Sequence, residues 1–105
     1  MTKYTMHQLD RRFKMHRAGF NLMLVWSWPA SSNELVIDHP WREYRHYQNI
    51  AEKRLGLAYY ESINKSGNWK PERKYRNGRA GGRPIIEERI YIRSEKYLTL
   101  LQLAI

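Results

Sequence analysis

The sequence predicts a single, mainly α-helical domain in which three long helices lie antiparallel, with a basic loop between the second and the third. Two observations lead to this prediction. Apolar side chains recur every three or four residues in three stretches of the chain, which is the spacing of one face of a helix. The three stretches also have similar lengths, roughly 22–24 residues or 35 Å, which suits antiparallel packing. A chain of 105 residues has room for one domain.

The first predicted helix runs from Thr5 to Trp28. Its apolar side consists of Met6, Leu9, Phe13, His16, Phe20, Leu24 and Trp28. Gly19 lies inside this helix, at a cost of about 1 kcal/mol relative to alanine. The alternative interpretation ends the helix at Gly19, a natural C-cap, and makes residues 20–28 a buried strand.

The second predicted helix begins at Pro40, because proline is tolerated in the first helical turn, and runs to about Ile63. Gly56 is its weak point, and the alternative ends the helix there. Pro29 separates this helix from the first one, and residues 30–39 between them are predicted to form a loop.

The third predicted helix follows Pro84 and continues to the C-terminus. The alternative is a strand over residues 85–93 followed by a helix capped by Ser94. A strand here has imperfect alternation, because Glu88 shares a face with Ile86 and Ile90. With strands near 20–28 and 85–93, the fold class becomes α+β.

The composition excludes several classes of protein. The chain has no cysteine, which excludes a disulfide framework, a thiolate zinc site and a cysteine nucleophile. The first twenty residues contain no apolar signal-peptide core, and the longest apolar run, Leu22 to Trp26, is too short to span a bilayer. We therefore expect a cytoplasmic or nucleoid-associated protein that is not secreted and has no membrane partner.

The charge of the chain points to an anionic partner. Nineteen Lys and Arg against ten Asp and Glu give a net charge of +9, which favours nucleic acid first and an acidic protein surface second. The excess is concentrated in residues 65–83, which are rich in glycine and predicted to form an irregular basic loop. Its candidate binding residues, seven cations and two aromatic rings, are Lys65, Trp69, Lys70, Arg73, Lys74, Tyr75, Arg76, Arg79 and Arg83.

Cations on a flexible backbone reach successive phosphates and release condensed counterions. The rings of Trp69 and Tyr75 lie between the cations, where each is able to stack on an unpaired base. A second basic patch, formed by Arg11, Lys14 and Arg17, extends this surface if it folds beside the loop.

Catalytic and metal-binding patterns are missing from the sequence. The four histidines do not have the spacing of a zinc hydrolase, and no phosphate-binding loop or nucleophilic-serine elbow is present. We predict no enzyme activity, no metal, no cofactor and no small-molecule substrate. The predicted function is phosphate-backbone binding to DNA or RNA through loop 65–83. The alternative is a non-catalytic inhibitor or accessory protein, of the kind that mobile elements use, bound to a host nucleic-acid-processing complex.

Overall fold

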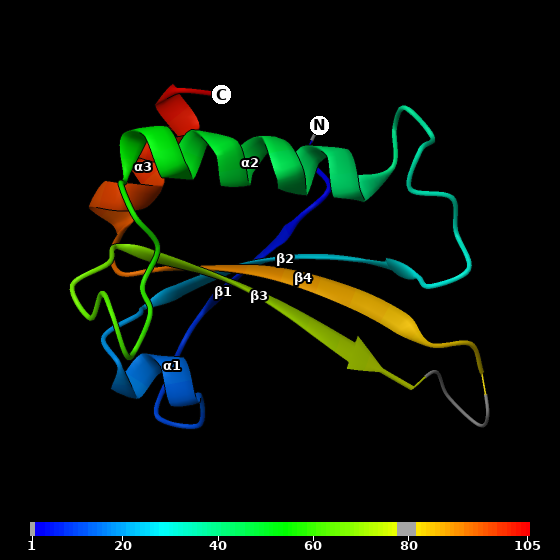
Figure 1. Cartoon of the computed structure of the whole chain (residues 1–105). Helices are drawn as coiled ribbons and strands as arrows, with labels where there is room; N and C mark the ends of the chain where they lie inside the picture. Colours follow the sequence, from blue (N-terminus) through cyan, green and yellow to red (C-terminus); the bar gives the residue numbers. More distant parts are fainter. Residues whose placement is uncertain (1, 78–81) are drawn as a thin grey trace.

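The protein is an antiparallel four-stranded sheet with helices on both of its faces. The structure, a computed structural model, describes residues 2–77 and 82–105. In chain order, the elements of this part are β1 (Thr5–Gln8), α1 (Lys14–Arg17), β2 (Leu22–Pro29), α2 (Pro40–Arg54), β3 (Trp69–Arg76), β4 (Ile85–Ile92) and α3 (Glu95–Leu103). Figure 1 shows α2 and α3 above the sheet and α1 below it.

The sheet has the strand order β1-β2-β4-β3, so that β2 and β4 lie in the centre and β1 and β3 at the edges. Every neighbouring pair is antiparallel. The register places Leu24 opposite Ile90, and Ile90 opposite Pro71 on the far side. Because side chains alternate along a strand, residues 70, 72, 74 and 76 of β3 share one face of the sheet with residues 87, 89 and 91 of β4.

The prediction of three long helices is wrong. The first predicted helix is interrupted at Gly19, whose φ of +100° lies in the left-handed region, and only four residues before it are α-helical. The segment after it is strand β2, and the segment after Pro84 is strand β4. These two strands lie near the segments for which a strand was the alternative.

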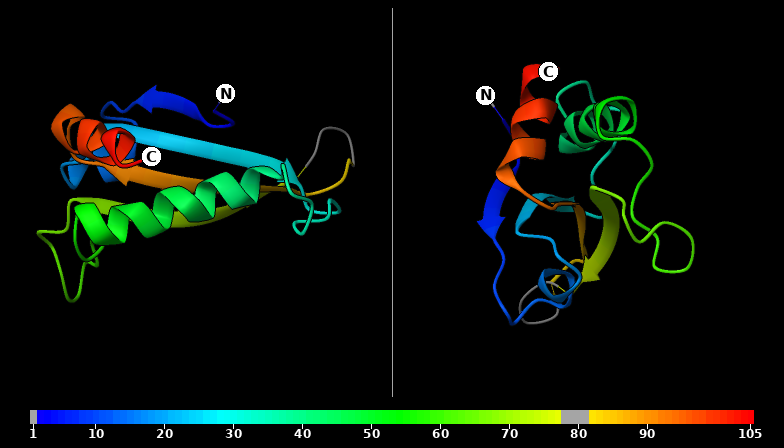
Figure 2. Two further views of the ribbon diagram at one scale, coloured as in Figure 1. Left: turned by 90° about the horizontal axis from the view of Figure 1, so that it is seen from above. Right: turned by 90° about the vertical axis from the view of Figure 1, so that its left-hand side faces the viewer.

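The larger part of the core lies between the sheet and the two longer helices. Trp26 and Ile90 from the sheet pack with Ala51 of α2 and Leu101 of α3, and all four are fully buried. Figure 2 shows α2 and α3 side by side on this face. The buried residues of α2 are Tyr44, Tyr47 and Ala51, which lie three and four residues apart and therefore share one face of the helix.

A second, smaller core lies on the opposite face of the sheet. Met15 of α1 and Phe20 after it cover Met23 of β2 and Tyr91 of β4. This cover explains why Leu22 to Trp26 are buried without interruption, since β2 has apolar neighbours on both faces.

Helix α2 begins where the sequence indicates and ends early. The Nδ1 atom of His39 accepts the backbone N–H of Trp41 at 3.1 Å and caps the helix, with Pro40 in its first turn. The helix ends before Gly56, which has a φ of +86°. In the described part of the chain, none of the helices has the length and apolar character that a membrane span requires.

Residues 65–83, predicted as an irregular loop, contain an eight-residue strand. Strand β3 pairs with β4 along its whole length. Pro71 is tolerated because β3 is an edge strand and one side of its backbone needs no ladder hydrogen bond. The sequence indicates a loop because strong β-formers are few here, but pairing with β4 overrides this weak local preference.

Candidate nucleic-acid interface

The alternation of β3 separates the predicted binding residues into two sets. Trp69, Arg73 and Tyr75 share the face that carries α2 and α3, whereas Lys70 and Lys74 lie on the opposite face. Trp69 is only 1% exposed, and its Nε1 donates to the carbonyl of Gly56 at 2.8 Å. Trp69 is therefore a core residue, and its ring cannot stack on a base. The Tyr75 ring is exposed, near the end of the strand.

Arg73 is bound to a glutamate of the neighbouring strand. Its Nε donates to the Glu88 carboxylate, and the register places the two residues directly opposite each other. The Glu88 side chain is almost fully buried. Burial and the adjacent Glu88 carboxylate both raise the pKa of Tyr44 on α2. Arg73 neutralises a buried carboxylate, so its charge is already engaged in stabilising the fold and is less available to a partner.

The other face of β3 and β4 carries a network of alternating charges. The Arg89 guanidinium donates to Glu87 from Nε at 2.6 Å and to the Tyr91 hydroxyl from Nη1 at 2.9 Å. The Tyr91 hydroxyl in turn donates to Glu72 at 2.9 Å. Burial raises the pKa of Tyr91, and the Arg89 guanidinium opposes this shift. The network holds the side chains of both strands in place.

Two further predicted binding residues contact the glutamates of this network. Lys74 Nζ lies 3.7 Å from Glu72, and Arg76 Nη2 lies 3.5 Å from Glu87. Both cations are about half exposed, so the pairs are loose and solvated. Their charges are partly compensated within the protein.

Beside the network lies a cleft of about 800 Å³, which we call the α1–β3 cleft. Its walls are α1, the turn after Tyr59 and the first half of β3. The lining residues are Lys14, Met15, Arg17, Ala18, Tyr59, Tyr60, Glu61, Ser62, Lys70 and Glu72. Two predicted sets of cations thus meet here, Lys14 and Arg17 from the second basic patch and Lys70 from residues 65–83.

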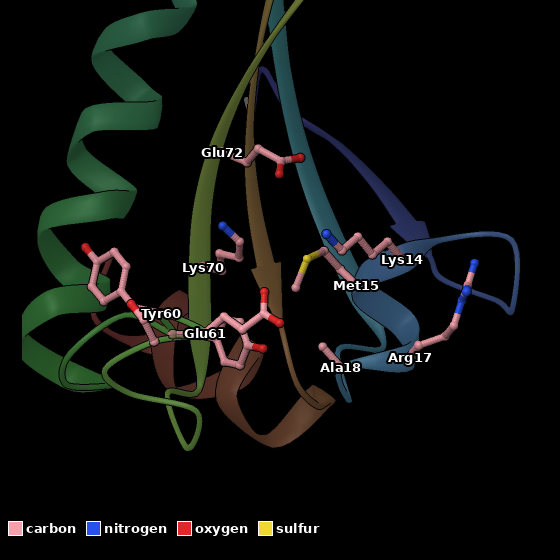
Figure 3. Close-up of a pocket in the computed structure, with 10 residues that line it drawn as sticks. Lys14, Met15, Arg17, Ala18, Tyr60, Glu61, Lys70 and Glu72 are labelled. Atoms are coloured by element: carbon pink, nitrogen blue, oxygen red, sulfur yellow. The ribbon is translucent and has the colours of Figure 1, made fainter.

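Figure 3 shows how the labelled side chains lie. The side chain of Lys14 extends from α1 over the cleft, and the Glu61 carboxylate points into it between Lys70 and Met15. Arg17 extends away from the centre along the outer side of α1, and the Tyr60 ring is directed toward α2. Among the described residues, Lys14, Arg17, Lys70 and Glu61 form no ion pair. They are the charges that remain free for a ligand.

Arg93, directly after β4, ties the two walls of this cleft together. Its guanidinium donates from Nη1 to the carbonyl of Ala18 at 2.9 Å and from Nη2 to that of Lys65 at 2.7 Å. A third bond, from Nε to the Gly67 carbonyl, measures 2.8 Å. The guanidinium also lies 4.5 Å above the Phe20 ring. No pattern in the sequence marks Arg93, because its partners are backbone carbonyls far away in the chain.

The remaining predicted site residues lie apart from the cleft centre. The side chain of Lys65 is exposed on the turn before β3. Arg11 is exposed in the turn before α1. Arg83 donates to the Ser31 hydroxyl at 3.3 Å, near the β3–β4 connection. Arg79 lies outside the described residues.

One side-chain pair resembles part of a catalytic site. The Ser32 hydroxyl lies 2.8 Å from His39 Nε2. His39 Nδ1 accepts the Trp41 N–H, so the proton of the neutral ring is on Nε2, which donates to the Ser32 hydroxyl. The Ser32 hydroxyl in turn donates to the carbonyl of Pro29 at 2.7 Å. A general base would need Nε2 unprotonated, so this arrangement shapes the loop and does not activate the serine. No group of three His, Asp or Glu side chains suited to a metal ion occurs in residues 2–77 and 82–105.

A scan against protein-family models finds no match to this chain, and searches among curated proteins and solved structures find none either.

Proposed function

We propose that this protein binds nucleic acid, without catalysing a reaction, through the sheet face that carries α1. The observation that supports the proposal most strongly is the meeting of Lys14 and Lys70 at one cleft, with Arg17 on its outer side, although they come from two segments more than fifty residues apart in the sequence. Three cations that form no ion pair within residues 2–77 and 82–105 attract a polyanion and release counterions when phosphates bind.

The same face continues along β3 with more positive charge. Lys70, Lys74 and Arg76 lie on this face, and the seven residues from 70 to 76 span about 20 Å. Lys74 and Arg76 form ion pairs with Glu72 and Glu87. We therefore expect each of them to contribute less to binding than Lys14 or Lys70. The predicted contact surface is thus the α1–β3 cleft with a weaker extension along β3, in place of a flexible loop.

The experiment is a binding titration with labelled single- and double-stranded DNA and RNA at physiological salt. The decisive variant is Lys14→Ala/Arg17→Ala/Lys70→Ala. Its matched control is Arg45→Ala/Lys53→Ala/Arg54→Ala, which removes the same charge from exposed positions on α2, across the sheet. We expect the cleft variant to bind at least tenfold more weakly than the control. Equal affinity of the two variants would overturn the proposal.

One observation favours a second candidate function, binding to a protein. Loop residues 35–37 hold three apolar side chains in solvent, and Leu35 and Ile37 are 77% and 86% exposed. The Arg42 guanidinium donates to the carbonyls of Leu35 and Val36 and fixes the loop in this shape. Figure 1 places this loop, between β2 and α2, at the end of the molecule away from α1. An apolar loop held by its own hydrogen bonds is suited to an apolar pocket on a protein.

This second candidate is tested by affinity capture from a host lysate. We expect the parent to retain a nucleic-acid-processing complex that Leu35→Ser/Ile37→Ser loses. The same set of captured proteins from parent and variant would contradict this candidate.

A further inference from the structure

We infer that the α1–β3 cleft takes one unpaired nucleotide of a single strand, with its phosphate between Lys14 and Lys70 and a hydrogen-bond donor of its base or sugar on Glu61. The inference rests on the proposed function and adds the class of nucleic acid. It follows from the mixed charge of the cleft, from its concave shape and from the fixed position of its walls.

The carboxylate of Glu61 is the feature that a general phosphate-binding surface does not explain. It points into the cleft beside Lys70 and forms no ion pair among the described residues. Glu72, the other carboxylate of the cleft, is already occupied by the Tyr91 hydroxyl and by Lys74. A free carboxylate repels a phosphate, so Glu61 weakens binding unless the ligand brings a donor to it.

A single-stranded nucleotide has both of the groups that this cleft accommodates. Its phosphate is an acceptor for lysine ammonium groups, and the amino groups of cytosine and adenine and the 2′-hydroxyl of ribose are donors. In a duplex, the bases are paired and stacked inside a convex cylinder. A splayed-out nucleotide exposes its phosphate, the full edge of its base and its sugar together, so that all three can enter a concave site.

The size and lining of the cleft fit such a ligand. Its volume of about 800 Å³ lies within the range of small-molecule sites. Met15, Ala18 and Tyr59 supply apolar surface between the charged groups. The Tyr59 ring packs edge-on against Phe20 at a centroid distance of 5.3 Å, which holds it in place.

The walls of the cleft are held before any ligand binds. Arg93 joins Ala18 on the α1 side to Lys65 and Gly67 on the β3 side through three hydrogen bonds. The backbone N–H of Tyr59 donates to the carbonyl of Trp69 at 2.7 Å and fixes the start of the turn that carries Glu61. A preorganised site loses less conformational freedom on binding, and this favours selection of one nucleotide geometry.

The test is the variant Glu61→Gln, because two explanations of the cleft predict opposite changes in its affinity for single-stranded oligomers. If the cleft is only a cationic surface, removal of a negative charge strengthens binding to every polyanion. If Glu61 accepts a hydrogen bond from a base or a sugar, the variant binds single-stranded cytidine oligomers about tenfold more weakly, because a charge-assisted bond becomes a neutral one. The same variant binds an abasic deoxyribose-phosphate oligomer as tightly as the parent does, or more tightly.

DNA and RNA oligomers of cytidine distinguish the two donors. Weaker binding to both identifies a base amino group as the donor, and weaker binding to RNA alone identifies the 2′-hydroxyl. Glu52→Gln on α2, which removes the same charge outside this cleft, should not weaken binding to the cytidine oligomers. Tighter or unchanged binding of Glu61→Gln to both cytidine oligomers would overturn the inference. The proposed function would stand in that case, because it depends on Lys14, Arg17 and Lys70.

Discussion

Replacing Arg73 with methionine keeps most of the side-chain length and removes the cation that faces Glu88. The Glu88 side chain is 5% exposed and that of Arg73 is 36% exposed. Removing one partner of a fully buried ion pair costs about 3–5 kcal/mol. Because water reaches Arg73 and screens part of this interaction, we expect a loss of about 2 kcal/mol in the free energy of unfolding. For a domain of this size, the loss corresponds to a decrease of about 10 °C in Tm.

Thermal and urea denaturation, followed by tryptophan fluorescence, measure this loss. The double variant Arg73→Met/Glu88→Met should recover most of the stability, because two apolar side chains replace the pair without leaving a buried charge. Lys74→Met is the control, since Lys74 is half exposed and 3.7 Å from Glu72, and it should cost less than about 0.5 kcal/mol. A Tm for Arg73→Met equal to that of Lys74→Met would refute the assignment of Arg73 to the fold.

Three further results are expected. Arg93→Lys loses the forked hydrogen bonds to the carbonyls of Ala18 and Lys65. We expect the free energy of unfolding to fall by about 2 kcal/mol and single-strand binding to weaken. Unchanged affinity in the folded variant would show that binding does not depend on the link between the cleft walls. Gly67→Ala forces a methyl group against the backbone of Ala58 and Tyr59, so urea denaturation should reveal a loss of about 2 kcal/mol, and a neutral result would contradict the close packing of this turn. The pKa of Tyr44 is raised, chiefly by burial, so its contribution to stability is complete below about pH 10 and is lost as the pH rises further. Urea midpoints that stay constant from pH 9 to 12, with parallel absorbance titration of the tyrosines, would rule this out.

The helix α2 was predictable and the sheet was not, for physical reasons. The spacing of Tyr44, Tyr47 and Ala51 and the capping position of His39 are local signals. The run from Leu22 to Trp26 is apolar on both faces of the sheet, and periodicity alone does not distinguish a doubly covered strand from a buried helix. The cover on its second face comes from Met15 and Phe20, through contacts that the sequence does not reveal.

The candidate site was predictable in charge and not in geometry. The concentration of cations in residues 65–83 is plain in the sequence, but their separation onto two faces depends on strand β3. Glu88 interrupts the apolar face of β4 and so argues against a strand in the sequence. Its burial there is explained by its ion pair with Arg73 on the adjacent strand. The meeting of Lys14 with Lys70 depends on the path of the chain around the sheet. Glu61 and Arg93 have no pattern in the sequence that marks them.

The salt dependence of single-strand binding tests the central proposal most directly. Each cation that contacts a phosphate contributes about 0.7 to the slope of log affinity against log salt. The variant Lys14→Ala/Arg17→Ala/Lys70→Ala should therefore have a slope shallower by about 2 than the parent, and the α2 control should keep the parental slope. A parental slope in the cleft variant would contradict the proposal that nucleic acid is held at the α1–β3 cleft.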